Sequence, residues 1–494
     1  METHEPESMN GQKTLGQYFT PEPVARSLVA WAKRSQKDRM LDPSCGDGIF
    51  LALHKRSVGV EQDHRIYSRA VANAPWALVH EGNFFTWANS TVERFDFATG
   101  NPPFIRYQHF SGRTRQTALD LCRTLGASFS GLTSSWAPFL VVTANLLKPG
   151  GRLAFVVPAE IGHAPYAQPL LTYLKQHFRT VHFVAVKEKL FPKLSEDVWL
   201  LYADGYADTQ KTCTLKFTVL NTFRPSATPP KSGTKLDFCE LEHWRGRLRP
   251  FLLPPVLRKL YLSLVQSSET VRLGDIAKVG IGYVTGANDF FHLRPSAVER
   301  LKIPWSFLQP TVRAGRFLPS VAVTPKTVAN WLDRDEPSLL LKLASTKDLP
   351  KSVKRYLNTK GARQAQAAYK CRTRTPWYSV PNVSIPDGFL SYLSSTGPML
   401  VANRADCSCT NSVHAVRLSN GIRFDSVQRV WSHDLVTLST ELEGHPLGGG
   451  LLKLEPREAS RVLVPMQLKL NSSEHSDLRE GVNLLRSWRH SASS

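Results

Sequence analysis

The sequence has no Cys-x-x-Cys pair of the kind that binds zinc or acts in redox chemistry. Its seven cysteines are an odd number and include no Cys-x-x-Cys spacing. This pattern argues against a disulfide framework and a thiolate metal site, and it predicts reduced thiols in the cytoplasm. The 15 histidines form no His-Glu-x-x-His motif either, so the sequence predicts no metal centre.

Long apolar runs are also missing. No stretch of about 18 apolar residues occurs, and the first residues, METHEPESMNGQKTLGQ, are polar. A membrane-spanning helix and a secretory signal both need an apolar core. We therefore expect no membrane partner and no signal peptide, and we expect a cytoplasmic location.

Acidic residues are scarce relative to basic ones. The chain of 494 residues holds 62 Lys and Arg against 41 Asp and Glu, a formal net charge of +21. The excess is uneven, because residues 1–200 hold 22 basic against 17 acidic residues and the remainder holds 40 against 24. A charge of this size favours a polyanionic partner, chiefly for the second part of the chain.

The densest basic segment runs from Lys347 to Arg374, with nine basic residues and one acid. Aromatic residues at 356, 369, 377 and 378 are interleaved with it or follow it closely. Like charges at this density repel one another unless an anion neutralises them, so we predict nucleic-acid binding here rather than a solvated face. The candidate DNA-binding residues are Lys351, Lys354, Arg355, Arg372 and Arg374.

The first 200 residues alternate apolar runs with amphipathic stretches. We expect strands within 39–48, 57–63, 95–104 and 151–160, helices over 21–35 and 136–151, and an antiparallel pair over 179–191 and 196–206 that finishes the sheet. Such alternation predicts an α/β domain with a doubly wound, mostly parallel sheet. A linker-like stretch, RPSATPPKSGTK, follows. We place the domains at 1–210 and 271–494, the second of mixed α+β structure, with a transition over 211–270.

Three loops of the first domain predict a nucleoside cofactor. DPSCGDG (42–48) has glycines for a tight turn and two acids, but no Lys or Arg to hold a pyrophosphate. Glu61 ends the next predicted strand, where an acid can accept both ribose hydroxyls. EGNFF (81–85) offers an amide and two aromatic rings to an adenine. A positively charged adenosine cofactor without phosphate indicates S-adenosylmethionine.

The stretch FDFATGNPPFIRY (95–107) ends a predicted strand in a stiff turn. Its two prolines fix φ and remove two backbone donors, so the turn is rich in carbonyl acceptors beside a phenylalanine. These features predict a cradle for a flat group that carries an NH₂.

The motifs together resemble the gamma-type DNA adenine-N6 methyltransferases, which include modification enzymes of bacterial restriction systems. The motifs, in order, are GQYFTP (16–21), DPSCGDG, VEQD (60–63), GNFF (82–85), NPPF (101–104) and LFPKLSED (190–197). The resemblance covers about the first 200 residues closely. The C-terminal part is similar in layout, with LGDIAKVGIGYVTGANDFFHL at its start and TNSVHAVRL late. It implies a Rossmann-like class I methyltransferase domain that binds S-adenosylmethionine, followed by a target-recognition domain that binds double-stranded DNA near the nucleoid. A separately encoded restriction endonuclease is an implied partner.

The resemblance also implies roles for single residues. The side-chain oxygen of Asn101 and the carbonyl of Pro102 accept the two amino hydrogens of adenine, Phe104 stacks on the flipped base, and Phe191 covers its other face. The implied cofactor-binding residues are Tyr18, Phe19, Thr20, Asp42, Ser44, Gly46, Asp47, Glu61, Asn83 and Phe84. Thr20 and Asp42 lie toward the methionine end. The chain departs from many relatives at Asn83, where they have Asp.

Three alternatives stay open at this point. NPPF or NPPY turns also occur in methyltransferases that act on glutamine in proteins or on RNA bases. A DNA-binding module whose methyltransferase half has lost activity is a second alternative, and a fused nuclease is a third. The motif GQYFTP and the basic C-terminal region favour DNA. No convincing PD…(D/E)xK pattern supports a nuclease in this chain.

Overall fold

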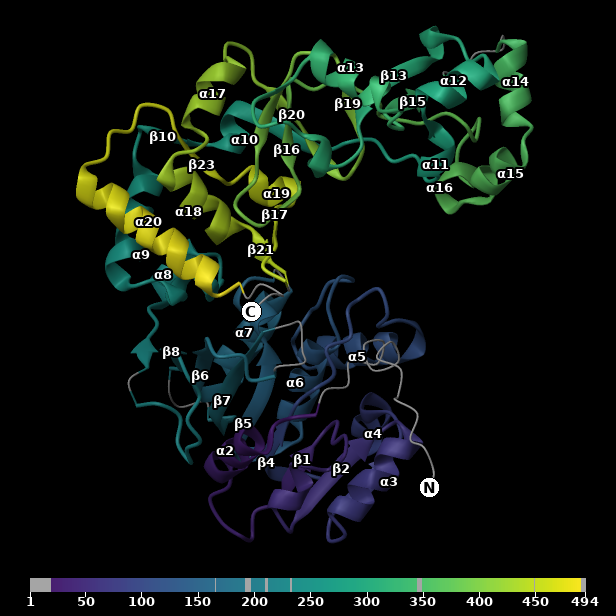
Figure 1. The fold of residues 1–494 in the computed structure, drawn as a ribbon. Helices are drawn as coiled ribbons and strands as arrows, with labels where there is room; N and C mark the ends of the chain where they lie inside the picture. Colours follow the sequence, from purple (N-terminus) through teal and green to yellow (C-terminus); the bar gives the residue numbers. More distant parts are fainter. Residues whose placement is uncertain are drawn as a thin grey trace, which may run out of the picture. The chain divides into compact units, whose positions relative to one another are not determined.

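The computed structural model describes residues 19–164, 166–191, 197–208, 212–231, 233–343, 349–447 and 449–489. The chain forms two compact units, Met1–Leu252 and Leu253–Ser494 (Figure 1). Among the described residues, no helix combines the length and the apolar character that crossing a membrane requires.

Unit 1 is built on a nine-stranded sheet with the order β3-β2-β1-β4-β5-β7-β6-β8-β9. Its strands are β1 (Met40–Asp42), β2 (Ser57–Glu61), β3 (Leu78–Glu81), β4 (Phe95–Gly100), β5 (Leu147–Pro158), β6 (Phe178–Val186), β7 (Val198–Tyr206), β8 (Thr214–Leu220) and β9 (Thr234–Lys235). The strands β3, β2, β1, β4 and β5 are parallel neighbours, and β7 runs antiparallel between β5 and β6. The predicted α/β class with a mostly parallel sheet is confirmed.

The connections between these strands carry the helices of unit 1. They are α2 (Glu22–Ala32), α3 (His64–Asn73), α4 (Phe84–Ser90), α5 (Gly112–Thr124), α6 (Trp136–Asn145), α7 (Ala167–His177) and α8 (Phe238–His243), with short 3₁₀ turns at Leu51–Leu53, Ala159–Gly162 and Arg249–Leu252. Parallel crossovers are right-handed, and the strand order reverses at β1, so α3 and α6 cover opposite faces. The reversal also opens a crevice at the carboxyl ends of β1 and β4, where doubly wound sheets bind ligands.

The central strands are buried on both faces, which fixes the loops at their ends. All residues of β1 and β2 are buried, as are the last six of β5, LAFVVP. Such continuous burial is typical of a sheet covered by helices on each side. The loops that follow these strands are therefore held on a rigid support.

Two details of unit 1 differ from the sequence prediction. The helix expected over 136–151 ends at Asn145, and β5 begins at Leu147, because Leu147 pairs with Phe95 of the neighbouring strand. The antiparallel pair of β6 and β7 is confirmed, but it does not finish the sheet. Strand β8, with its alternating apolar residues TLKFTVL, pairs parallel to β6 inside the predicted transition segment.

Unit 2 has mixed α+β structure, as predicted. Its largest sheet has five strands in the order β11-β20-β16-β18-β14, and a four-stranded sheet has the order β12-β15-β13-β19. The strands are β10 (Thr270–Arg272), β11 (Ala277–Ile281), β12 (His292–Leu293), β13 (Leu308–Val312), β14 (Ala322–Val323), β15 (Leu339–Leu341), β16 (Gly388–Ser391), β17 (Leu393–Ser394), β18 (Leu400–Asn403), β19 (Ser408–Cys409), β20 (Val413–Leu418), β21 (His445–Pro446), β22 (Leu452–Lys453) and β23 (Leu463–Pro465). The helices are α9 (Pro255–Gln266), α10 (Leu273–Ile276), α11 (Asn288–Phe291), α12 (Pro295–Leu301), α13 (Pro325–Asp333), α14 (Lys351–Leu357), α15 (Lys360–Ala367), α16 (Tyr369–Arg372), α17 (Phe424–Val430), α18 (Asp434–Glu443), α19 (Pro456–Ala459) and α20 (Ser472–Ser487).

Candidate active site

A pocket of about 490 Å³ lies in unit 1 at the carboxyl ends of the parallel strands. The loops after β1, β2, β3 and β4 all contribute to its lining. The sequence-predicted residues that line it are Phe19, Ser44, Gly46, Glu61, Asn83, Phe84 and Asn101. Thr20, Asp42, Asp47, Pro102, Phe104 and Phe191 are outside the lining, and all of them except half-buried Asp47 are buried. Tyr18 and most of the motif LFPKLSED lie outside the described residues.

The glycine loop after β1 wraps onto the end of β2. Gly46 and Gly48 have φ of +54° and +86°, a conformation that favours glycine. The N–H of Gly46 donates to Oε2 of Glu61 at 3.1 Å, and the N–H of Cys45 donates to the carbonyl of Val60 at 3.0 Å. The loop and Glu61 therefore form one hydrogen-bonded unit on one wall of the pocket.

Glu61 is only 6 % exposed, although it carries a carboxylate. Its Oε1 accepts the N–H of Asp63 at 2.9 Å, and the backbone of Gln62 also hydrogen-bonds with the carboxylate. Burial raises the pKa of Glu61 above its usual value, and these N–H donors oppose the rise. A carboxylate has about four lone-pair sites, so these backbone donors leave capacity to accept a hydroxyl group in the pocket.

Asp42 is fully buried at the end of β1. Its Oδ1 accepts the N–H of Ser44 at 3.1 Å, whereas Oδ2 has no hydrogen-bond partner in the described part of the chain. Burial, with smaller contributions from Glu61 and Asp47, raises the pKa of Asp42 to about 8. A buried carboxyl oxygen without a donor fits a nearby cationic group, which would favour the ionised form.

Gly100 brings Asp42 next to the NPPF turn. A Cβ at Gly100 would lie 2.8 Å from Oδ1 of Asp42 and 3.0 Å from the ring of Phe155. Only a residue without a side chain allows this approach. The strand β4 therefore ends in glycine where the acid and the turn meet.

Asn83 is the N-cap residue of α4 and Phe84 its first residue, and both line the pocket. The side-chain oxygen of Asn83 caps the helix, accepting the N–H groups of Phe85 at 3.0 Å and Thr86 at 3.2 Å. The ring of Phe84 stacks on Phe139, with centroids 5.1 Å apart and planes inclined by 14°. Because the oxygen serves the helix, the NH₂ of Asn83 is the group available to a ligand.

The NPPF turn is held by residues from two other segments. The hydroxyl of Ser44 donates to the carbonyl of Asn101 at 3.5 Å, and Ser135 contacts the turn at Pro103 and Ile105. Ser135 also lines the pocket. Sequence reasoning missed it, because a serine directly before a helix reads as an ordinary helix cap.

Four of the five predicted DNA-binding residues are exposed on unit 2. Lys351, Lys354 and Arg355 lie on α14 and Arg372 on α16. The guanidinium of Arg374 instead donates to the carbonyls of Thr285 at 2.7 Å and Val284 at 2.6 Å. Arg374 therefore fastens the chain around 284–285.

Three of the four aromatic residues of the basic segment pack against the rest of unit 2. The ring of Tyr356 stacks on Phe290 at 4.7 Å, and its hydroxyl donates to the carbonyl of Phe290 at 2.7 Å. Trp377 and Tyr378 pack against hydrophobic clusters of unit 2. Tyr369 is 64 % exposed. The pattern arises because α14 and its neighbours turn their apolar side chains inward and their cations outward.

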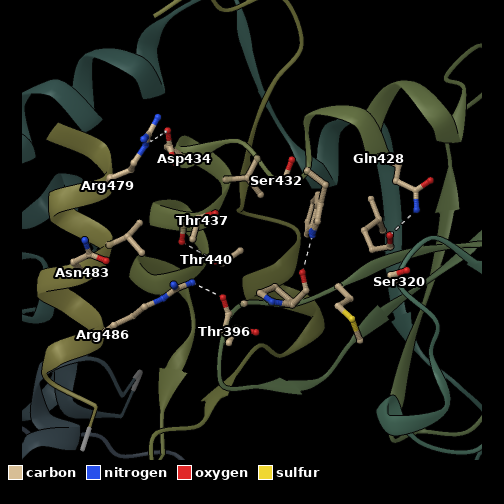
Figure 2. A pocket seen from close by; sticks show the side chains of 17 residues that line it. Ser320, Thr396, Gln428, Ser432, Asp434, Thr437, Thr440, Arg479, Asn483 and Arg486 are labelled. Carbon is tan, nitrogen blue, oxygen red and sulfur yellow. Dashed lines mark hydrogen bonds and ion pairs between the residues drawn. The ribbon is translucent and has the colours of Figure 1, made fainter. Parts of the chain in front are cut away.

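A second pocket, of about 530 Å³, lies in unit 2 between α18, α20 and the segment around Thr396 (Figure 2). Its charged side chains are already paired. Nε of Arg479 lies 3.0 Å from Oδ2 of Asp434, and Nε of Arg486 lies 3.1 Å from Oε1 of Glu441. The pocket is slightly larger than that of unit 1, but none of the cofactor-binding or catalytic residues predicted from the sequence motifs lines it. We therefore place the candidate active site in unit 1.

Two family models match this chain. "Type II methyltransferase M.Eco57I, C-terminal domain" covers residues 246–492, half of the chain, and "Eco57I restriction-modification methylase" covers residues 54–191. The second match contains Glu61 and the NPPF turn, and the first contains almost all of unit 2.

Similar proteins span most of the chain. It is 21 % identical to Type II methyltransferase M.AccI of Acinetobacter calcoaceticus, over 98 % of this chain and 91 % of that protein. It is 22 % identical to Type II methyltransferase M.XamI of Xanthomonas campestris pv. amaranthicola, over 91 % and 85 %. A shorter match, 31 % identical over 29 % of this chain and 62 % of the relative, is to a tRNA1(Val) (adenine(37)-N6)-methyltransferase of Pasteurella multocida. The resemblance that the sequence motifs indicate is thereby confirmed, and the chain belongs to the Type II methyltransferase M.Eco57I family of restriction-modification methylases, which methylate DNA with S-adenosylmethionine as the methyl donor.

Proposed function

We propose that this methylase acts on N6 of adenine in a specific sequence of double-stranded DNA, after the base has left the duplex. One observation carries the proposal. Asn101, at the carboxyl end of β4, lines the same pocket as Glu61, at the carboxyl end of β2. The NPPF turn, whose carbonyls can accept hydrogen bonds from an amino group, therefore lies on the same pocket as Glu61, which can accept the hydroxyls of a ribose.

The chemistry needs orientation more than a strong base. The lone pair of adenine N6 is delocalised into the ring, which makes the nitrogen a poor nucleophile. In our proposal the side-chain oxygen of Asn101 and the carbonyl of Pro102 accept both amino hydrogens, which localises the lone pair and aims it at the methyl group. The bound cofactor supplies that methyl group on a positively charged sulfur. Phe104 stacks on the extruded base, and Phe191 covers its other face.

The cofactor residues fit the same scheme. We assign Asp42, Thr20 and Asp47 to the positively charged methionine end, and Glu61 to the ribose hydroxyls. Asn83 and Phe84 take the adenine ring of the cofactor. The unpartnered oxygen of Asp42 supports a cation at that end. The other proposed members of the site are Tyr18, Phe19, Ser44 and Gly46.

The acceptor base is tested by analysing the methylated product. Purified protein is incubated with labelled S-adenosylmethionine and either duplex DNA, transfer RNA or a protein extract, and the digested products are analysed by mass spectrometry. We expect N6-methyladenine in DNA. Methyl groups on cytosine, RNA or protein glutamine would overturn the proposal, as would failure to bind the cofactor. The similarity to a tRNA1(Val) (adenine(37)-N6)-methyltransferase supports adenine N6 and also makes RNA the strongest alternative acceptor.

The proposal also assigns different roles to the two units. Residues 253–494 hold 32 Lys and Arg against 19 Asp and Glu. We assign recognition of the DNA sequence to this unit and methyl transfer to unit 1. Cleavage of unmodified DNA, in this scheme, belongs to a separately encoded endonuclease.

Replacing Lys351, Lys354 and Arg355 together with Ala should weaken binding to all DNA sequences similarly. Each neutralised phosphate releases counterions and contributes about 0.9 to the slope of log affinity against log salt. The triple variant should therefore flatten that slope by up to about 3 units. The measurement is a salt titration by fluorescence anisotropy.

A matched control removes the same charge elsewhere on unit 2. Lys259, Lys326 and Arg457 are exposed on α9, α13 and α19, away from the basic segment in sequence. Equal flattening by the two triple variants would show that only the overall charge matters. An unchanged slope in the α14 variant would identify that segment as a solvated face.

Glu61→Ala should weaken cofactor binding strongly and leave DNA binding nearly unchanged. Hydrogen bonds to a charged acceptor contribute about 1.5–3 kcal/mol each, so the loss of two should raise the dissociation constant by at least a hundredfold. Calorimetry with S-adenosylmethionine measures it. Glu81→Ala is the control, because Glu81 is the exposed register partner of Glu61 on β3. Wild-type affinity in the Glu61 variant would remove this residue from the site.

A further inference from the structure

We infer that Ser135 is a positioning residue that holds the NPPF turn in its reactive shape through a single hydroxyl group. The inference rests on the proposed role of this turn in methyl transfer. Ser135 precedes α6, more than 30 positions after the turn in the sequence. It is fully buried and lines the pocket beside Asn101.

The hydroxyl of Ser135 does not do what its place in the helix predicts. Serine at the N-cap usually accepts an N–H from the first turn of its own helix. Within the described structure, Ser135 makes no such capping bond to α6. Its Oγ instead accepts the N–H of Ile105 at 3.0 Å and donates to the carbonyl of Pro103. The serine at the N-cap position of α6 therefore hydrogen-bonds with the segment around Phe104 instead of with its own helix.

These contacts grip the backbone on both sides of Phe104. The hydroxyl holds the carbonyl before this residue and the N–H after it. In addition, the N–H of Ser135 donates to the carbonyl of Ile105 at 3.0 Å. The direction of the Phe104 ring is therefore set from outside the turn, by one residue with three hydrogen bonds.

The turn needs such an external support because of its two prolines. Neither Pro102 nor Pro103 has an N–H, so the turn lacks two of the backbone donors that could hold its shape from within. The carbonyl of Pro103 already accepts the hydrogen bond from the Ser135 hydroxyl, which distinguishes it from the carbonyl of Pro102. The carbonyl of Pro102 is then the one that our proposal assigns to the amino group of the base.

The support itself is rigid. Trp136, the next residue, is fully buried and donates its Nε1–H to the hydroxyl of Tyr166 at 3.1 Å. Tyr166 also hydrogen-bonds with the side chains of Ser134 and Glu160. Ser135 is thus fixed to a buried polar cluster that spans α6 and the segment after β5. A rigid anchor transmits its position to the turn.

The test compares Ser135→Ala with Ser135→Thr. Alanine removes the hydroxyl, whereas threonine keeps it. A displacement of about 1 Å at a reacting group can cost a hundredfold in rate. We expect Ser135→Ala to lower the single-turnover rate of methyl transfer, at saturating DNA and cofactor, by ten- to a hundredfold. Cofactor and DNA dissociation constants should change less than twofold. The threonine variant should recover most of the rate.

Further measurements separate positioning from a merely structural role. A 2-aminopurine at the target position should still brighten with Ser135→Ala, because the base leaves the duplex but is held in the wrong orientation. If either other variant folds poorly, Ser135→Cys takes its place. Cysteine has nearly the size of serine but a weaker hydrogen-bonding group, so its rate should be intermediate between those of alanine and serine. Ser130→Ala removes an exposed hydroxyl of the same segment and should behave as wild type.

Two results would overturn the inference. One is a wild-type rate in Ser135→Ala. The other is a loss of cofactor affinity in proportion to the rate, with no recovery by threonine, which would make Ser135 a packing residue. The product analysis of the wild type tests the proposed function independently of Ser135. A methyl group found on another acceptor would contradict the proposed function. The ratio of the variant rate to the wild-type rate would still test the role of Ser135.

Discussion

Asn101→Ala is expected to lower the rate of methyl transfer by at least a hundredfold while cofactor and DNA affinities stay near those of the wild type. Removing one preorganised group that polarises the reacting centre typically costs about 10²–10³ in rate. In our proposal the contact of Asn101 with the amino group strengthens as the lone pair localises, so its loss appears in the chemical step. Single-turnover transfer of labelled methyl groups into an oligonucleotide measures the rate.

The control for this variant is Asn89→Ala. Asn89 is an exposed amide on α4 of the same unit, so its removal should leave the rate unchanged. Phe104 should behave differently from Asn101. Stacking contributes about 1–3 kcal/mol per base, so Phe104→Ala should impair capture of the extruded adenine and Phe104→Trp should preserve it. Normal methylation by Asn101→Ala would show that the turn is not an adenine cradle.

The parts of the fold that were predictable carry their signal locally. The strands that end at Asp42, Glu61 and Gly100 are short and mostly buried, and two of them are followed by loops with special backbone needs, the glycines at 46 and 48 and the prolines at 102 and 103. Parallel strands of one sheet end at the same edge, so three such loops had to meet. That argument required no knowledge of distant contacts.

The parts that were missed depend on contacts across the sequence. Ser135 reads as a helix cap until the turn around Pro103 is placed beside it. Gly100 reads as an ordinary strand end, although its closeness to Asp42 excludes any side chain. Strand β8 lies in the predicted transition between the domains, yet it pairs with β6 of the first domain.

The apolar residues within the basic segment also depend on contacts that charge alone does not indicate. Val353, Tyr356 and Leu357 follow helical spacing, and Val353 is buried while the other two are half-buried. This periodicity marks one apolar face of α14. The charge density of this segment does not reveal that face, on which the ring of Tyr356 packs against Phe290.

Asp42→Asn should stabilise the cofactor-free protein in alkaline conditions and weaken cofactor binding at the same time. Burial raises the pKa of this carboxyl from 3.8 to about 8 in the folded chain. Between these two values the folded state holds a proton that the unfolded state has lost. Wild-type stability should therefore fall as the pH rises through this window, by about 1.4 kcal/mol per pH unit from this group.

Asparagine keeps the shape of the protonated acid and does not titrate. Its side-chain oxygen can still accept the N–H of Ser44, which Oδ1 of Asp42 accepts in the wild type. Relative to the wild type, the variant should gain on the order of 4 kcal/mol between pH 5 and pH 8. Thermal unfolding at the two pH values measures this difference. Asp120→Asn, which alters a partly exposed acid paired with Arg123 on α5, should show no such gain.

With the cofactor bound, the ionised form of Asp42 should be favourable, whereas in the cofactor-free protein it is unfavourable. A cation beside Oδ2 favours the ionised carboxylate, so the wild-type affinity for S-adenosylmethionine should rise between pH 6 and pH 9 as Asp42 loses its proton. The asparagine variant offers no charge, and its affinity should be lower and should lack this contribution to the rise. Calorimetry at several pH values compares the two proteins. If the variant matches the wild type in both affinity and pH dependence, Asp42 does not face the cationic part of the cofactor, and its unpartnered oxygen needs another explanation.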